Sequence, residues 1–120
     1  MPTVLIADDD FISLEVLKSM LAQHQVEVIS ATNGQEALDQ ARARQPDLCI
    51  LDYEMPDLTG AEVCQELRQE PAFHSTPIVA LTGHQADTEL SACRAAGMNQ
   101  TLYKPVAPDA LADLLASLLP

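Results

Sequence analysis

Short runs of predominantly apolar residues recur along this chain, and they constrain its fold more than any other feature of the sequence. Such runs are typical of strands that are buried on both faces, because both sets of side chains then contact other layers of the protein. A weaker run covers residues 101–103. The four stronger runs are residues 4–7, 26–29, 48–51 and 78–81. The sequence therefore predicts five strands.

Between these runs, apolar residues recur at the three- and four-residue spacing of amphipathic helices. The first stripe predicts a helix that packs against the sheet through Ile12, Val16, Leu17, Met20 and Leu21. The other stripes fall within residues 37–41, 61–67, 86–93 and 110–118. Strands that alternate with helices in this way predict an α/β fold, whose parallel sheet is covered on both faces and wound with right-handed crossovers.

Length and charge limit the classes of function. The chain has 120 residues, so we expect a single domain over residues 1–120. Its formal net charge of −12 disfavours direct nucleic-acid binding and contact with an anionic membrane. The 3 cysteines form no C-x-x-C pair and are expected to be core residues in a reducing compartment. Neither a membrane span nor a signal peptide is recognisable, which predicts a cytoplasmic protein.

Polar residues with useful chemistry follow four of the five predicted strands. Ligands of open parallel α/β sheets bind beyond the carboxyl ends of the strands, so these residues are candidates for one site. We expect Asp10 to cap the following helix, where the helix dipole favours an acid, and the others to form the site. In chain order the residues are Asp8, Asp9, Asp10, Asp52, Thr82 and Lys104.

Asp8, Asp9 and Asp52 converge at this edge if the first and third strands are neighbours. Two carboxylates about 4 Å apart repel each other by about 4 kcal/mol at an effective dielectric constant of about 20. An all-oxygen site of this kind favours Mg²⁺ over zinc or copper. Lys104 adds a positive charge and Thr82 a hydroxyl, and a carboxylate can attack phosphorus to form an aspartyl phosphate. The set is therefore suited to receive a phosphoryl group.

Five motifs make the sequence resemble the receiver domain of response regulators, the phosphoacceptor of two-component signalling. The resemblance implies a flavodoxin-like, doubly wound (βα)5 fold with a five-stranded parallel sheet in the strand order 2-1-3-4-5, which places the first and third strands side by side. In the family's order, the motifs are VLIADDD at residues 4–10, LDYEMPDLTG at 51–60, IVALTG at 78–83, AG at 96–97 and YKP at 103–105.

The resemblance also implies roles for individual residues. Asp52 would be phosphorylated, and Mg²⁺ would be bound by Asp8, Asp9, Asp52 and the backbone carbonyl of Glu54. The phosphoryl group would come from a histidine kinase or a histidine phosphotransfer domain. The domain would assist its own phosphorylation and dephosphorylation, and it would be a switch rather than a turnover enzyme.

The switch itself would involve Thr82 and Lys104, drawn inward by the new charge, with a change of the face formed by the fourth helix, the fifth strand and the fifth helix. Many receivers carry an aromatic residue at the position of Thr101, whereas here the aromatic residue is Tyr103. The usual coupling between threonine and aromatic ring is therefore in question. Receivers also form weak homodimers through the last helix, an association that the sequence leaves open.

The context of the domain and three other functions stay open at this point. Residues 97–99 and 103–106 resemble receivers of hybrid sensor histidine kinases; the alternatives are a stand-alone regulator and a receiver excised from a DNA-binding regulator.

A phosphatase with an aspartate nucleophile has an acid two residues later, a position held here by Glu54. A flavodoxin-like cofactor carrier needs a neutral phosphate loop where this chain has three aspartates. A pseudo-receiver would bind a partner without chemistry.

Overall fold

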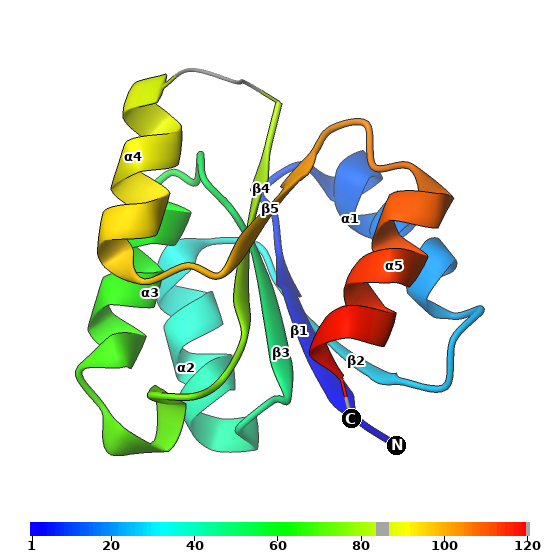
Figure 1. Cartoon of the computed structure of the whole chain (residues 1–120), viewed down its shortest axis with the longest axis horizontal. Coiled ribbons are helices and arrows are strands. Elements are labelled where there is room, and N and C mark those ends of the chain that lie inside the picture. Colours follow the sequence, from blue (N-terminus) through cyan, green and yellow to red (C-terminus); the bar gives the residue numbers. More distant parts are fainter. Residues whose placement is uncertain (84–86, 120) are drawn as a thin grey trace.

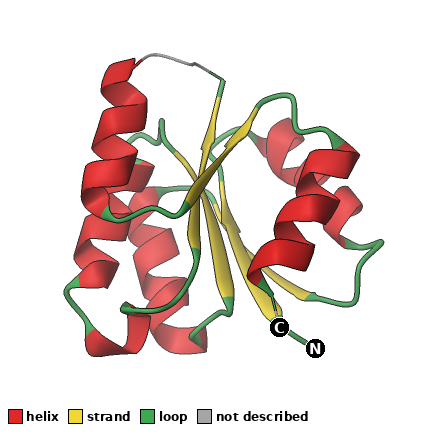
Figure 2. Ribbon diagram, viewed as in Figure 1, coloured by secondary structure: helices red, strands yellow, loops and turns green. Residues whose placement is uncertain are grey.

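A single parallel sheet forms the centre of the molecule, with the strand order β2-β1-β3-β4-β5 (Figures 1 and 2). The structure is a computed structural model that describes residues 1–83 and 87–119. All residues of the two central strands β3 and β4 are buried, as their apolar sequences predict. The strands are β1 (Thr3–Ala7), β2 (Glu27–Ala31), β3 (Leu48–Asp52), β4 (Ile78–Thr82) and β5 (Gln100–Tyr103). The predicted fold class and strand order are confirmed.

Helices cover both faces of this sheet and divide the core into two layers. Side chains of α2, α3 and α4 pack with one face of the sheet, whereas those of α1 and α5 pack with the other (Figure 1). The helices are α1 (Phe11–Leu21), α2 (Gly34–Arg44), α3 (Gly60–Arg68), α4 (Asp87–Ala96) and α5 (Pro108–Leu118), with a short 3₁₀ turn at Pro71–Phe73. No helix among the described residues is long and apolar enough to cross a membrane.

The predicted core stripe of α1 is wrong at two positions. Ile12 is 72% exposed and Val16 is 48% exposed, and the residues that α1 buries are Leu14, Leu17 and Leu21. At 100° per residue these three leucines share one side of the helix, and Ile12 and Val16 fall on the opposite side. The helix therefore carries two apolar stripes, of which only one faces the sheet.

Each strand also differs from its predicted range by one or two residues. The second strand begins at Glu27 rather than Val26 and continues through Ala31, because Ser30 and Ala31 pair with the last two residues of β1. Ala86, the first residue of the apolar stripe that predicts the fourth helix, lies outside the described residues.

The helix starts follow local hydrogen-bonding rules. Asp10 accepts a hydrogen bond from the backbone N–H of Ile12, which confirms its predicted role as the cap of α1. Asn33 caps α2 in the same way. Thr59 and Glu62 form a reciprocal capping box at the start of α3. These caps fix where the loops at the carboxyl edge of the sheet end.

Asp57 ties the loop after β3 to the start of α2. Its Oδ1 accepts from the N–H groups of Gly34 at 2.7 Å and Leu58 at 2.8 Å, and its Oδ2 accepts from the N–H of Gln35 at 2.9 Å. These backbone donors, with that of Gln35 first, lower the pKa of the exposed Asp57 carboxyl. The ionised carboxylate thus links two loops that are far apart in the sequence.

We expect Asp57→Asn to lower the free energy of unfolding at pH 7. The folded-state pKa of Asp57 lies below its ordinary value of 3.8, so its contribution is complete above that value and is lost as the pH falls through the folded-state pKa. Urea unfolding at several pH values between about 7 and about 3 should show the difference between wild type and variant shrinking toward acid pH. A difference that stays constant over this range would contradict the role of the ionised carboxylate.

Candidate active site

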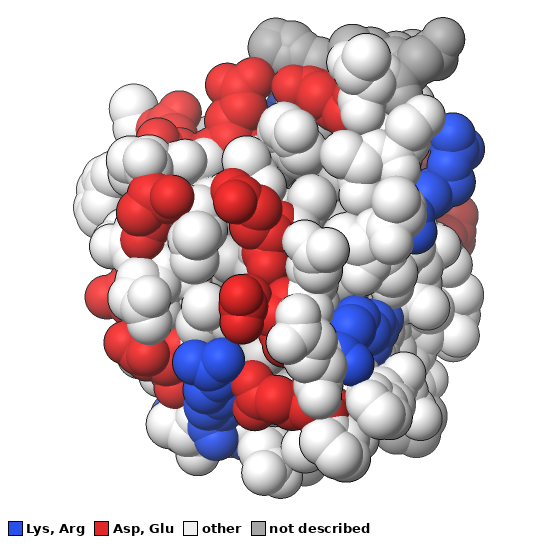
Figure 3. Space-filling view, turned by 90° about the vertical axis from the view of Figure 1, so that its left-hand side faces the viewer, with Lys and Arg blue, Asp and Glu red and all other residues white. Residues whose placement is uncertain are grey.

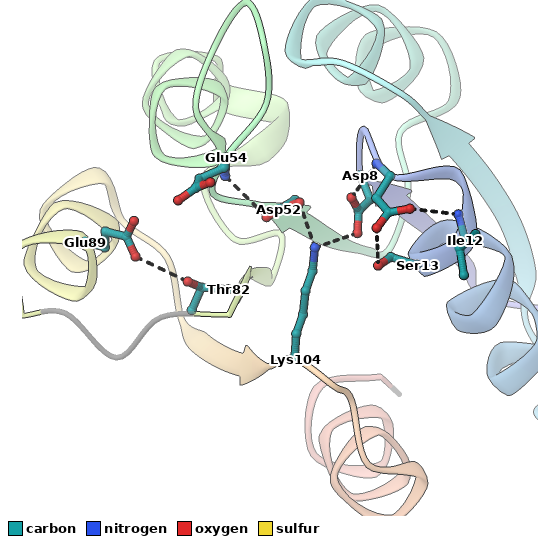
Figure 4. Close-up of polar contacts among 9 residues, drawn as sticks. Asp8, Ile12, Ser13, Asp52, Glu54, Thr82, Glu89 and Lys104 are labelled. Atoms are coloured by element: carbon teal, nitrogen blue, oxygen red, sulfur yellow. Dashed lines mark hydrogen bonds and ion pairs between the residues drawn. The ribbon is translucent and has the colours of Figure 1, made fainter.

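The carboxyl ends of four strands bring the predicted site residues together at one edge of the sheet (Figure 4). Ala7 pairs with Leu51, which sets Asp8, directly after β1, beside Asp52, the last residue of β3. Thr82, the last residue of β4, pairs with Tyr103 of β5, and Lys104 follows directly. The register of the sheet therefore brings the two carboxylates, the hydroxyl of Thr82 and the ammonium of Lys104 to the same edge.

Asp8, Asp9 and Asp52 form an acidic cluster in which one carboxylate oxygen from each lies within 4.8 Å of the others. Asp8 is 1% exposed and Asp52 is 5% exposed, whereas Asp9 is on the surface. Asp8 is held in place by a 2.9 Å hydrogen bond that its Oδ1 accepts from the N–H of Asp10. The predicted convergence of the three carboxylates is present in the structure.

Lys104 bridges the two buried acids. Its Nζ lies 2.9 Å from Asp52 Oδ2 and 3.0 Å from Asp8 Oδ2. Burial lowers the pKa of Lys104, but hydrogen bonds to Asp52 and Asp8 outweigh it, and the net pKa is raised. The lysine therefore stays charged and offsets part of the repulsion between the acids.

The electrostatic balance of the cluster remains negative. Three carboxylates face one ammonium group, which gives these four side chains a net charge of −2 when all of them are ionised. Burial raises the pKa of Asp52 to about 6, Asp8 adds to this effect, and Lys104 partly opposes it. A group with a raised pKa in a cleft of this kind is a candidate for chemistry.

The acidic cluster fits a hard divalent cation. All three side chains offer oxygen ligands, and no histidine or cysteine belongs to the group. Mg²⁺ prefers oxygen donors and uses one or two carboxylates together with waters and phosphate oxygens. Asp8 Oδ2 is buried and lies against the ammonium of Lys104, and a carboxylate oxygen has a second lone pair that a cation could use.

The remaining predicted residues line or flank a cleft of about 280 Å³. Thr82 is 4% exposed, and its hydroxyl donates to Glu89 of α4 at 3.4 Å. The N–H of Glu54 donates to Asp52 Oδ1 at 3.3 Å, which places the Glu54 backbone beside the cluster. The cleft is lined by Asp9, Asp10, Asp52, Glu54, Thr82, Gly83 and Lys104.

Thr101 is placed apart from the others. It pairs with Ala80, two residues before Thr82 on β4, so it lies one layer below the edge of the sheet. Glu89 contacts Thr82 but was not predicted, because only the position of α4 across the edge brings it there. His84, two residues after Thr82 in the sequence, lies outside the described residues.

Comparison with known proteins agrees with this geometry. The sequence profile described as "Response regulator receiver domain" matches residues 4–116. The chain belongs to this family. The receiver is 30% identical over 113 residues to the signal transduction histidine-protein kinase BarA of Escherichia coli K12, a match that covers 94% of this chain and 12% of that kinase. The receiver thus spans only a small part of that relative.

Two solved structures are similar over almost the whole receiver. The chemotaxis protein CheY4 of Vibrio cholerae is 31% identical with a TM-score of 0.93, and the match covers 99% of each chain. The receiver domain of the sensor histidine kinase PA1611 of Pseudomonas aeruginosa PAO1 is 26% identical with a TM-score of 0.91, covering 98% of this chain and 96% of that one. The PA1611 structure has a magnesium ion coordinated in its active site cleft.

We expect Asp52→Asn to raise the free energy of unfolding by about 1–2 kcal/mol at neutral pH in the presence of a chelator. The substitution removes a carboxylate that burial and Asp8 disfavour, and solvent screening limits the gain to this range. Added Mg²⁺ should stabilise the wild type more than the variant, because the variant has lost one anionic ligand.

Urea unfolding with a chelator and with Mg²⁺ measures both effects. Asp10→Asn is the matched control: it removes a neighbouring charge from the same cleft but no proposed ligand, and it keeps an oxygen that can cap α1. Its response to Mg²⁺ should therefore be closer to that of the wild type than the response of Asp52→Asn is. Two results together would contradict this interpretation of Asp52. In chelator, Asp52→Asn would have a lower free energy of unfolding than the wild type, and Mg²⁺ would raise the free energy of unfolding of both proteins by the same amount.

Proposed function

We propose that this receiver is a phosphoacceptor switch in which Asp52 takes a phosphoryl group from a phosphohistidine donor. The observation that carries the proposal is the cluster itself: a buried carboxylate flanked by two further acids, with an ammonium group 2.9 Å away and a cleft that opens onto it. Membership of the receiver family supports the same role.

The proposed reaction transfers one group and leaves the donor intact. A carboxylate oxygen of Asp52 forms a bond to phosphorus, the bond between phosphorus and the donor's imidazole nitrogen breaks, and that nitrogen keeps the electron pair and takes up a proton. The ammonium of Lys104, already beside Asp52, can stabilise the negative charge of the transferred oxygens. Positioning and electrostatics supply most of the rate in such transfers.

Asp8, Asp9, Asp52 and the backbone carbonyl of Glu54 would hold Mg²⁺. When bound, the ion would neutralise charge on the acids and on the phosphoryl oxygens. The N–H of Asp10 and the ammonium of Lys104 hold the Asp8 carboxylate, and the N–H of Glu54 and the same ammonium hold that of Asp52. These residues keep the cleft ready for a dianionic group that the three acids alone would repel.

Once Asp52 carries the group, Thr82 and Lys104 would reorient toward it. The added charge of about −1.5 to −2 supplies the driving force. Thr82 ends β4 and Lys104 follows β5, so the response would reach the α4, β5 and α5 face, where a regulated partner would bind. A domain that holds its own product in this way is a switch rather than a turnover enzyme.

The donor would dock on α1. Phe11, Ile12 and Val16 are exposed apolar side chains on this helix, which begins two residues after Asp9. Two of them, Ile12 and Val16, line a cleft of about 400 Å³ between α1 and the loop after β5. The other lining residues are Ser13, Leu17, Met20, Lys104, Pro105 and Val106. An exposed apolar patch of this kind marks a surface for another protein.

The charge of the receiver argues against nucleic acid as a direct partner. Figure 3 shows that acidic side chains outnumber basic ones on the face that includes α3 and α4, and the net charge of the chain is −12. A hybrid sensor histidine kinase as the context of this receiver stays a prediction, as do a cytoplasmic location, a weak homodimer and a single domain over residues 1–120.

We expect acetyl phosphate and Mg²⁺ to add one phosphoryl group to the protein, detected by intact-mass spectrometry. Asp52→Asn should abolish the gain, because an amide oxygen is a far weaker nucleophile than a carboxylate. Asp10→Asn should keep it, since this residue caps α1 outside the cluster. A mass gain that survives Asp52→Asn would place the modification elsewhere and reject the proposal.

We expect Ile12→Glu to slow transfer from a phosphohistidine donor at least about tenfold, because it places a charge in an apolar contact. Modification by acetyl phosphate should stay at the wild-type rate, since this small donor makes no contact with α1. The matched control is Ala43→Glu, an exposed position on α2 at the opposite face of the sheet. The docking surface is not on α1 if Ile12→Glu slows transfer from both donors equally. The same conclusion follows if Ala43→Glu slows transfer from the phosphohistidine donor as much as Ile12→Glu does.

A further inference from the structure

Glu89 contacts the proposed switch threonine from outside the cluster. The Thr82 hydroxyl donates to Glu89 Oε2 at 3.4 Å, a contact in which Thr82 is buried and Glu89 is partly buried. Glu89 is the third residue of α4. Figure 4 shows the hydroxyl of Thr82 turned toward Glu89, with Asp52 on its other side. The acid of α4 and the acid of β3 thus flank the same hydroxyl.

We propose that Glu89 is a positioning residue that holds Thr82 in its resting orientation, so that phosphorylation of Asp52 is coupled to α4 through this contact. The inference rests on the proposed function of Asp52. A threonine hydroxyl has one hydrogen to donate. Thr82 can therefore serve Glu89 or a phosphoryl oxygen on Asp52 but not both, and the two acceptors compete.

The competition has a direct consequence for α4. When Thr82 turns to the phosphoryl group, the Glu89 carboxylate loses this donor while partly buried, and an unpaired charge in that setting is unfavourable. The new negative charge on Asp52 has the same sign as Glu89 and adds to the effect. Both changes favour movement of Glu89 toward solvent, and Glu89 carries the first turn of α4 with it.

The residues of β5 are less well placed than Glu89 to transmit a movement of Thr82. Thr101 is a short side chain one layer below Thr82. Tyr103 stands opposite Thr82 in the sheet, but its side chain is 41% exposed. The Thr82 hydroxyl donates a hydrogen bond to Glu89 of α4, a side chain that is partly buried. The contact to α4 is therefore the route that the geometry supports.

The test uses beryllium fluoride with Mg²⁺ as a mimic of the phosphoryl group on Asp52, with binding measured by calorimetry. Glu89→Ala should bind the mimic at least about fivefold more tightly than the wild type, because the competing acceptor is gone. Glu89→Gln keeps a neutral acceptor oxygen and should show a smaller gain, and it also serves if the alanine variant folds poorly. Glu66→Ala removes the same charge from an exposed position on α3 and should leave the affinity unchanged.

A second arm repeats the measurement in a Thr82→Val background. The gain from Glu89→Ala should vanish there, because the two residues then no longer interact, whereas a role in the stability of α4 would leave it in place. A wild type that fails to bind the mimic would overturn the proposed function, and the role of Glu89 with it. If the wild type binds the mimic, two results would overturn the role of Glu89 alone. One is that Glu89→Ala and Glu66→Ala bind the mimic with the same affinity. The other is that Glu89→Ala still raises the affinity in the Thr82→Val background.

Discussion

The contact on which the site depends is the bridge from Lys104 to Asp8 and Asp52. Two buried carboxylates would repel each other strongly in a medium of low dielectric constant, and an ammonium group 3.0 Å or less from both makes their proximity tolerable. One lysine is not enough for three acids, however. The cluster is therefore stable enough to persist in the fold, yet it still favours the approach of a further cation.

The topology of the sheet creates this arrangement. β1 lies between β2 and β3, so the chain winds away from β1 in both directions and leaves a crevice at the point where the strand order reverses. Asp52 ends a strand that is buried on both faces, and the start of α3 packs directly on its backbone. A Cβ added to Gly60 would come within 2.5 Å of the Asp52 carbonyl oxygen. The carboxylate is therefore held by a rigid backbone while the side chains around it can reorient.

The sequence predicted the elements and the edge residues because both follow simple rules. Buried runs marked the strands, and the residue after each strand marked the site. It did not predict which stripe of α1 faces the sheet, since Leu14 and Ile12 both suit a helix and periodicity alone does not distinguish its two apolar sides. Glu89 also escaped prediction, because its contact with Thr82 depends on how α4 crosses the edge of the sheet.

The position of Asp52 at the centre of the sheet makes its surroundings asymmetric. On the α1 side, Asp8 is fixed by the N–H of Asp10, and that residue also caps α1. On the α4 side, the Thr82 hydroxyl donates a longer hydrogen bond to Glu89. If Asp52 gains charge, a new acceptor competes for this hydroxyl, whereas the hydrogen bond from the N–H of Asp10 to Asp8 has no such competitor. Docking of the donor on α1 and the response of α4 can thus occupy opposite sides of one residue without competing for the same surface.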